Sequence, residues 1–377
     1  MKNFIYIRPQ ENEKEFTTFC FYNSFLPQLQ LHYKESKEPP VFSFEGLQRI
    51  SPLVLPNLLG IGYYLSKYHK EPIELLLSYE PKLLYYLFST DFFRISALQT
   101  AINPKGLNIY NFDQRFIGGF SEYINKYQRK EHKVHYYIPI NTSVDDMNSH
   151  DELMEDLTLF TLPNQFETVL MDTIPEKSIP KSIESIAEPI SNGILHSKSI
   201  TWAISQTTPL PYSKTVLSIV DVGIGFEESI KRKGIEKVII SKVKKMGYHK
   251  DYLNDYFFIM EALHFSMLKN RYGLIDFIFR VAESGTVRIH YNSTQILFTP
   301  RLLNKAYSLR ECRKKIIKEF EENDTISSSL KKKVITEIIN LSQSLLDLFN
   351  NDKQYSSIRI YSVIFKGVHI EFELPKI

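Results

Sequence analysis

Residues 188–197 read EPISNGILHS and carry a polar side chain at every fourth position. On a helix this spacing places Glu188, Asn192 and His196 on one face, one turn apart. An asparagine oxygen suits Mg²⁺ held against phosphates, and a glutamate one turn earlier can orient or deprotonate an attacking water. The same spacing is also typical of a solvated polar helix face. The pattern alone therefore leaves both interpretations open.

A second motif, DVGIG at residues 221–225, follows the apolar run VLSIV, which predicts a buried strand. A carboxylate at a strand end can accept a hydrogen bond from an exocyclic amine such as that of adenine. Two glycines let the backbone approach the base without a Cβ in the way. By itself D-x-G-x-G is also an ordinary turn signal. Its combination with the preceding helix, and with a Gly273-Leu274 pair that opens a later helix, is rarer than its parts.

Together these segments resemble the motifs of GHKL ATPases, the family that includes gyrase, the histidine kinases and the anti-sigma serine kinases. Residues 188–197 resemble the N-box in its E-x-x-x-N-x-x-x-H-S version, and residues 221–225 resemble the box that binds adenine. Weaker similarities are RYGL at 271–274, GTVRI at 285–289 and FKGVHIEFELP at 365–375. The resemblance covers about residues 157–377.

This resemblance implies an α+β protein whose C-terminal part is a two-layer α/β sandwich of the Bergerat ATP-binding type, with ATP and Mg²⁺ as cofactors. It implies Glu188 as general base or water-orienting residue and Asn192 as Mg²⁺ ligand. The other implied nucleotide contacts are Asp221 for adenine, Gly223 and Gly225 for the pocket floor, and Arg271 and Gly273 for the phosphate end of the lid. Because proline is costly inside a helix, Pro189 predicts that the helix begins near Ala187 or kinks there.

The N-terminal part has a β-α-β-α pattern and resembles a STAS-type anti-sigma antagonist domain. The similarity lies in FSFEGLQRISP at 42–52 and in the strand IELLL at 73–77. Where phosphorylatable members carry Asp-Ser-Ser-Gly this chain reads SPLV at 51–54, so we do not expect the C-terminal part to phosphorylate it. The expected domains are a STAS-like α/β domain at 1–145 and a GHKL-type domain at 150–377. A helical insertion is expected at about 302–350.

Apolar periodicity predicts the remaining elements. Strands are expected at 72–77, 133–140, 216–220, 286–291, 295–299, 357–365 and 368–374. Helices are expected at 53–68, 81–88, 183–194, 256–268, 274–282, 302–320 and 329–349.

Composition narrows the partners and the compartment. In 377 residues, 46 Lys and Arg face 43 Asp and Glu, and a net charge of +3 gives no indication of nucleic acid or of an anionic membrane. Cys20 and Cys312 lie far apart, and neither belongs to a CxxC motif or a Cys/His cluster, so the sequence has no disulfide framework and no zinc signature. Apart from His196, the histidines are scattered singly, which is more typical of satisfied surface or core residues than of ligands. Without a signal peptide or a long apolar run, we expect a soluble, cytoplasmic protein.

Two functions stay open at this point. The first is an ATP-binding signalling or regulatory protein with slow ATP hydrolysis or phosphotransfer, an ATPase or protein serine kinase that acts on a protein partner and is compatible with homo-oligomerisation. The second is a non-catalytic interaction scaffold that uses nucleotide only as a conformational switch or does not bind it. Arg271, in place of the first lid glycine, and Val368, in place of the family threonine, motivate the second.

Overall fold

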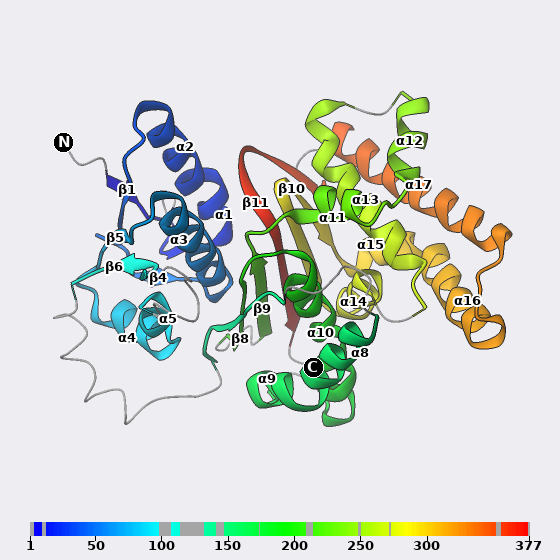
Figure 1. Cartoon of the computed structure of the whole chain (residues 1–377), viewed down its shortest axis with the longest axis horizontal. Coiled ribbons are helices and arrows are strands. Elements are labelled where there is room, and N and C mark those ends of the chain that lie inside the picture. Colours follow the sequence, from blue (N-terminus) through cyan, green and yellow to red (C-terminus); the bar gives the residue numbers. More distant parts are fainter. Residues whose placement is uncertain are drawn as a thin grey trace.

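The computed structural model describes residues 4–9, 13–97, 107–113, 132–140, 147–172, 174–208, 214–247, 250–270, 273–351 and 356–375. The protein is α+β, with one parallel and one antiparallel main sheet. Figure 1 shows the N-terminal elements on one side of the antiparallel sheet and a layer of helices on its other side. Among the described residues, no helix is both long and apolar enough to cross a membrane.

The N-terminal part is built around a four-stranded parallel sheet. Its strands are ordered β1 (Phe4–Tyr6), β3 (Val41–Ser43), β5 (Ile73–Leu76) and β6 (Tyr110–Asn111). A short pair, β2 (Glu15–Phe16) and β4 (Arg49–Ile50), lies beside it. The helices are α1 (Thr18–Cys20), α2 (Leu26–Glu35), α3 (Leu55–His69), α4 (Pro81–Ser89) and α5 (Phe92–Ser96), and a π-helical stretch at Phe21–Phe25 joins α1 to α2.

The antiparallel sheet has five strands in the order β10-β11-β9-β8-β7. These are β7 (His135–Tyr137), β8 (Thr201–Thr207), β9 (Lys214–Asp221), β10 (Thr286–Phe298) and β11 (Ile358–Pro375). Successive side chains of a strand point to opposite faces, and both faces are covered here. On β11, Ile370 and Phe372 pack into the core under the helices, whereas His369 contacts the N-terminal part.

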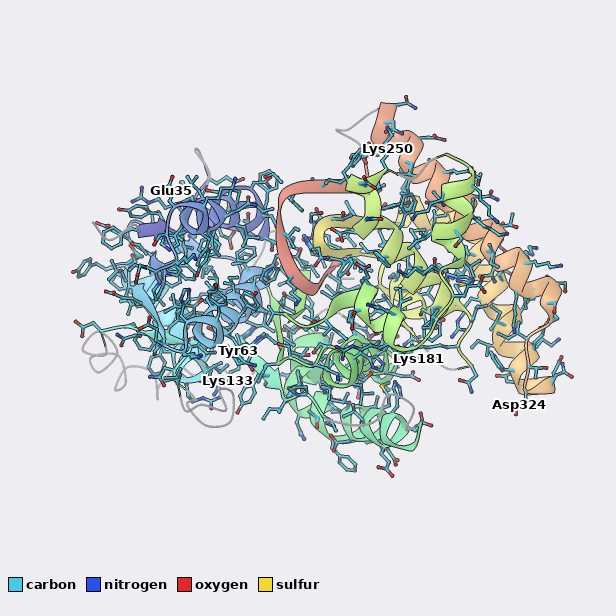
Figure 2. The ribbon with its side chains drawn as sticks, turned by 45° about the horizontal axis from the view of Figure 1, so that its top comes forward. Glu35, Tyr63, Lys133, Lys181, Lys250 and Asp324 are labelled. Carbon is cyan, nitrogen blue, oxygen red and sulfur yellow. The ribbon has the colours of Figure 1, made fainter. Side chains whose placement is uncertain are left out.

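Helices cover the first face of this sheet. They are α8 (Met147–Asp156), α9 (Leu162–Met171), α10 (Ile179–His196), α11 (Gly225–Arg232), α12 (Val238–Lys245), α13 (Asn254–Met267) and α14 (Leu274–Val281). Between β10 and β11 the chain forms α15 (Pro300–Lys305), α16 (Tyr307–Asn323) and α17 (Ser328–Asn351). Figure 2 shows Asp324, at the turn between α16 and α17, at the opposite end of the molecule from Glu35 of α2.

The N-terminal part shares a hydrophobic core with the second face of the sheet. Trp202, Val220 and Phe365 of the sheet belong to the same buried cluster as Phe21 and Phe25. The approach is close, since a Cβ on Gly60 of α3 would lie 3.0 Å from a methyl of Val222. β7, whose residues fall within the range expected for the first domain, hydrogen-bonds to β8 of this sheet. The sheet is therefore buried on both faces.

Several local predictions differ from the structure. The two strand pairs expected at 286–299 and 357–374 are single long strands, because an irregular step at Asn292 (φ 50°) and Gly367 (φ 115°) bends each strand without ending it. The helix that carries Pro189 does not begin near Ala187. It begins at Ile179 and continues through the proline to His196. The expected domain boundary lies in a polar, acidic segment at 141–156, and the part of this segment from Met147 to Asp156 forms α8.

Candidate functional site

One pocket lies between α10, the loop after β9, α11, α13 and β11, and it holds about 880 Å³ of space, counting the part open to solvent. Its wall includes Glu188 and Asn192 from α10, Asp221 from the end of β9, Gly225 from the start of α11, and Leu274 from the start of α14. Residues of the motif at 188–197 and of the DVGIG motif at 221–225, which are separate in the sequence, therefore line one pocket. The spacing of four between Glu188 and Asn192 does place both on the same face of α10.

The α10 pair is locked by its own hydrogen bonds. Asn192 Nδ2 donates to the main-chain oxygen and to Oε1 of Glu188, both at 2.9 Å. The ammonium of Lys269 lies 3.2 Å from the same Oε1, and the Glu188 side chain is about 1% exposed. Among the described residues, Glu188 Oε2 has no hydrogen-bond partner. Because the Asn192 amide donates toward Glu188, its Oδ1 is the atom left to accept or to ligate.

Asp221 ends β9 in a buried position beside Val368 of β11, with which it pairs in the sheet. Its Oδ1 accepts the main-chain N–H of Gly223 at 3.0 Å. Burial raises the pKa of Asp221 to about 7, although the N–H groups of Gly223 and Val368 oppose this rise. A buried carboxyl of this kind gains from a further donor that favours its ionised form.

The two glycines of the DVGIG loop are required by close contacts. A Cβ on Gly223 would collide with the main-chain oxygen of Ser197, which already accepts the N–H of Ile224 at 2.9 Å. Gly225 has φ +69°, and a Cβ there would strike the ring of Tyr291. The loop is therefore held against the end of α10. Of the two glycines expected at the pocket floor, Gly225 lines the pocket, whereas Gly223 packs against Ser197.

Two lysines that sequence patterns did not single out also line the pocket. Lys233 follows α11 and Lys269 follows α13, and their ammonium groups lie 5.5 and 5.8 Å from the centre of the Phe265 ring. The ammonium of Lys233 is 3.1 Å from Nε2 of His196. Burial, together with these two lysines, lowers the pKa of His196 to about 3, so this imidazole is neutral at pH 7. The pocket wall thus carries cations near Glu188.

The glycine expected at the phosphate end of the lid, Gly273, is the N-cap residue of α14, and its N–H donates to Asp276 Oδ2 at 2.9 Å. Asp276 is in turn held by Arg313 of α16 at 2.7 Å. Arg313 also donates to the main-chain oxygens of Met267 and Lys269. The start of α14 is therefore fixed by the helices between β10 and β11. Arg271 lies outside the described residues.

The pocket joins an apolar slot to a polar rim. Ile219, Val368 and Ile370 of the sheet, with Phe226 and Leu274, supply flat apolar walls around Asp221. Such a slot fits a planar ring that offers an amine to Asp221. Asn192 Oδ1 and Glu188 Oε2 offer oxygen ligands of the kind that Mg²⁺ takes. No family model, curated protein or solved structure matches the chain.

Proposed function

We propose that this chain is an ATP-binding signalling or regulatory protein with a GHKL-type Mg-ATP site in the pocket between α10 and the DVGIG loop. One observation carries the proposal: residues from both sequence motifs line the same pocket, namely Glu188 and Asn192 from the first and Asp221 and Gly225 from the second. The order of elements also supports a Bergerat-type fold: a helix with the first motif, an antiparallel strand that ends in the second, and a later helix before two more strands.

The adenine ring would lie against Ile219, Val368 and Ile370, with its amine donating to Asp221. Because burial raises the pKa of Asp221 to about 7, the empty pocket carries a carboxyl that is costly to ionise. An amine donor would favour the ionised form, so nucleotide binding would be coupled to loss of a proton near neutral pH.

Mg²⁺ and the phosphates would lie at the Asn192 side of the pocket. Asn192 Oδ1 would hold the metal, which fits because the amide nitrogen is already committed to Glu188. Bound there, the ion supplies charge neutralisation to the phosphates. Lys233 and Lys269 would add positive charge, and Glu188 Oε2 is the atom placed to orient or deprotonate a water.

The N-terminal part would act as a STAS-like sensor or docking unit for a protein partner. Its parallel sheet with flanking helices supports this, and so does its contact with the sheet face opposite the pocket. Through the shared strands β9 and β11, a change at one face can reach the other, because the side chains of Asp221 and Val220 are neighbours on one strand.

The second candidate function is a non-catalytic scaffold. Two contacts and one missing hydroxyl favour it. Lys269 already pairs with Glu188, Asp276 occupies the N–H of Gly273, and Val368 brings no hydroxyl to the adenine side. Such a protein would bind nucleotide without turnover, or would not bind it.

Thermal unfolding with and without Mg²⁺ and ATP, together with a phosphate-release assay, tests the proposal. A ligand that binds only the folded state stabilises it by about 2.7 kcal/mol at a hundredfold excess over Kd. We expect this stabilisation in the parent and in Glu236→Ala, an exposed control, and its reduction to about 0.4–1.4 kcal/mol in Asp221→Ala, whose affinity should be tenfold to hundredfold lower. Stabilisation without phosphate release would favour the scaffold, and no stabilisation would contradict ATP binding altogether.

A further inference from the structure

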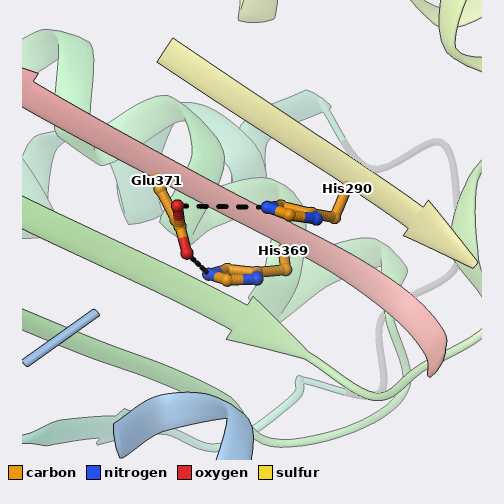
Figure 3. A group of neighbouring side chains, drawn as sticks. All are labelled: His290, His369 and Glu371. Carbon is orange, nitrogen blue, oxygen red and sulfur yellow. Dashed lines mark ion pairs between the residues drawn. The ribbon is translucent and has the colours of Figure 1, made fainter. Parts of the chain in front are cut away.

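A second group of polar side chains is buried on the opposite face of the sheet, away from the proposed nucleotide pocket. His290 of β10 pairs directly with His369 of β11, and Glu371 lies two residues further along β11, on the same face. All three are at most 2% exposed. Figure 3 shows both imidazoles beside the Glu371 carboxylate. The strand register therefore brings two histidines and one carboxylate together.

Their distances suit ligands of one ion. His369 Nε2 lies 3.2 Å from Glu371 Oε1, His290 Nε2 lies 3.9 Å from Glu371 Oε2, and the possible ligand atoms are all within 4.8 Å of one another. Metal–ligand bonds of about 2.0–2.2 Å in a tetrahedral site place neighbouring ligand atoms about 3.3–3.6 Å apart. The observed separations are close to this range. Binding one ion requires the His290 ring to turn out of its stack with His369, so that the two Nε2 lone pairs converge on the ion.

Hydrogen bonding leaves the cluster incompletely satisfied. Glu371 Oε1, close as it is to His369, accepts no hydrogen bond from any described residue, and His290 Nδ1 also has no partner. The two imidazole rings stack with their centres 4.6 Å apart. His369 Nε2 lies 3.1 Å from Ser218 Oγ and His290 Nε2 lies 3.4 Å from Gln295 Nε2, so an ion would replace these two contacts. The unpartnered oxygen of Glu371 is the group that gains most from an ion.

Neighbouring charges are balanced among themselves. Arg288 lies 3.6 Å from Glu371 Oε2, but it makes a shorter ion pair of 2.7 Å with Glu373. Lys214 shares Glu373 as well. Arg288 therefore orients Oε2 of Glu371, and the Glu373 carboxylate offsets the positive charge of Arg288.

The N-terminal part supplies the groups that orient His369. Asn57 Nδ2 of α3 lies 3.0 Å from His369 Nδ1, and the Asn57 oxygen has no partner among the described residues. Turning the amide by 180° places this oxygen where it accepts a proton from Nδ1, which frees Nε2 as a ligand. Tyr22 stacks on His290 with ring centres 4.6 Å apart. The cluster is thus complete only where the two parts of the chain meet.

A pocket gives access to the cluster. About 860 Å³ of space, part of it open to solvent, lies between the N-terminal part and the sheet, and both His290 and Glu371 line it. Thr17 and Ser51 of the N-terminal part lie on its other wall. Water or a small anion from this pocket can complete the coordination of an ion held by three protein ligands.

We propose that His290, His369 and Glu371 bind one divalent first-row transition metal ion, such as Zn²⁺, with its remaining coordination positions open to this second pocket. Asn57 is a positioning residue for His369. All three ligands belong to β10 and β11, and Asn57 connects the site to the N-terminal part. This site is separate from the proposed nucleotide pocket and does not depend on it.

Metal analysis of the purified full-length chain tests the proposal. After treatment with a chelator, Zn²⁺ is titrated back by competition with a chromophoric chelator, and Co²⁺ is added as a spectroscopic probe. We expect one tightly bound ion per chain and visible Co²⁺ absorption bands of the intensity of a four- or five-coordinate site. Elemental analysis before chelation distinguishes zinc from iron or manganese. Absence of uptake and of Co²⁺ bands in the folded parent overturns the proposal.

Variants locate the ion. His290→Gln, His369→Gln and Glu371→Gln should each weaken Zn²⁺ binding at least a hundredfold, and Asn57→Ala should weaken it about tenfold to a hundredfold. His264→Gln is the matched control, because His264 is buried beside Glu261 on the other side of the sheet without a second histidine. Circular dichroism checks folding. Tight binding that survives His369→Gln in a folded variant contradicts the site, and if a variant does not fold, the Co²⁺ spectrum of the parent decides.

Discussion

The substitution Asp221→Asn should change the stability of the folded protein and its nucleotide binding in opposite directions. The pKa of Asp221 rises from an ordinary 3.8 to about 7 because the carboxyl is buried. The folded state therefore holds a proton that the unfolded state releases between about pH 4 and 7, and stability falls as pH rises through this window. A tenfold change in an equilibrium is worth about 1.4 kcal/mol, so the ionised carboxyl costs about 4 kcal/mol above pH 7.

Asparagine is neutral at every pH, so the variant escapes this cost. It keeps an oxygen for the N–H of Gly223 but loses the acceptor for Val368, which costs about 1–3 kcal/mol at all pH values. The pH dependence is the cleaner signal: relative to the parent, Asp221→Asn should gain about 4 kcal/mol between pH 4 and pH 8. Its amide also offers the adenine amine a second donor, so nucleotide binding should be lost while stability at pH 8 rises.

Urea unfolding at one-unit steps from pH 4 to pH 8 measures this difference. Asp251→Asn, at an exposed aspartate, is the control. Parallel stability profiles for the parent and Asp221→Asn would show that Asp221 ionises without cost in the folded protein. The argument that the pocket holds a strained carboxyl awaiting a donor would then be refuted.

Three other predictions concern separate contacts. Glu188→Ala should leave ATP affinity unchanged or slightly higher and should lower any hydrolysis by about 10²-fold or more in a phosphate-release assay, and an unchanged rate would show that Glu188 is not the base. Arg313→Ala removes the buried partner of Asp276 and should lower the free energy of unfolding by about 3–5 kcal/mol, whereas Arg310→Ala, at an exposed ion pair, should change little. Burial lowers the pKa of His369 from 6.5 to about 3, so stability should be complete above pH 6.5 and should fall as pH drops toward 3. His369→Gln should flatten that acid limb, and an equally steep limb would contradict the assignment.

Local sequence patterns predicted the parts of the pocket that depend on local geometry. A spacing of four within one helix places Glu188 and Asn192 on one face whatever surrounds the helix. A strand that runs into D-x-G-x-G likewise leaves Asp221 at a strand end. Both predictions concern residues close in sequence, and both side chains line the same pocket.

The parts that depend on distant contacts could not be predicted. Lys233 and Lys269 reach the pocket because two helix ends pack around Phe265, and no spacing indicates this. Arg313 holds a helix start thirty-seven residues earlier in the chain. The pairing of His290 with His369 depends on strand register across the helices α15–α17. His290 and His369 are isolated in the sequence, which favoured satisfied core histidines over ligands.

The expected boundary between two domains also depends on distant contacts, which the sequence does not reveal. A polar segment suggested separation, but apolar side chains on both faces of β8 and β9 decide otherwise: Ala203 and Leu217 pack under the helices, and Trp202 and Val220 pack under the N-terminal part. A near-continuous apolar run along a strand, as in 216–220, indicates that both faces are buried. It does not reveal which element covers each face.

Isothermal titration of the full-length chain with Mg²⁺ and a non-hydrolysable ATP analogue tests the central claim most directly. We predict one site per chain in the parent, unchanged binding in Glu188→Ala, and a tenfold to hundredfold loss in Asp221→Ala, because removal of the adenine hydrogen bond costs about 1–3 kcal/mol. Absence of heat in the folded parent, or equal binding by the parent and Asp221→Ala, would contradict the assignment of this pocket to ATP.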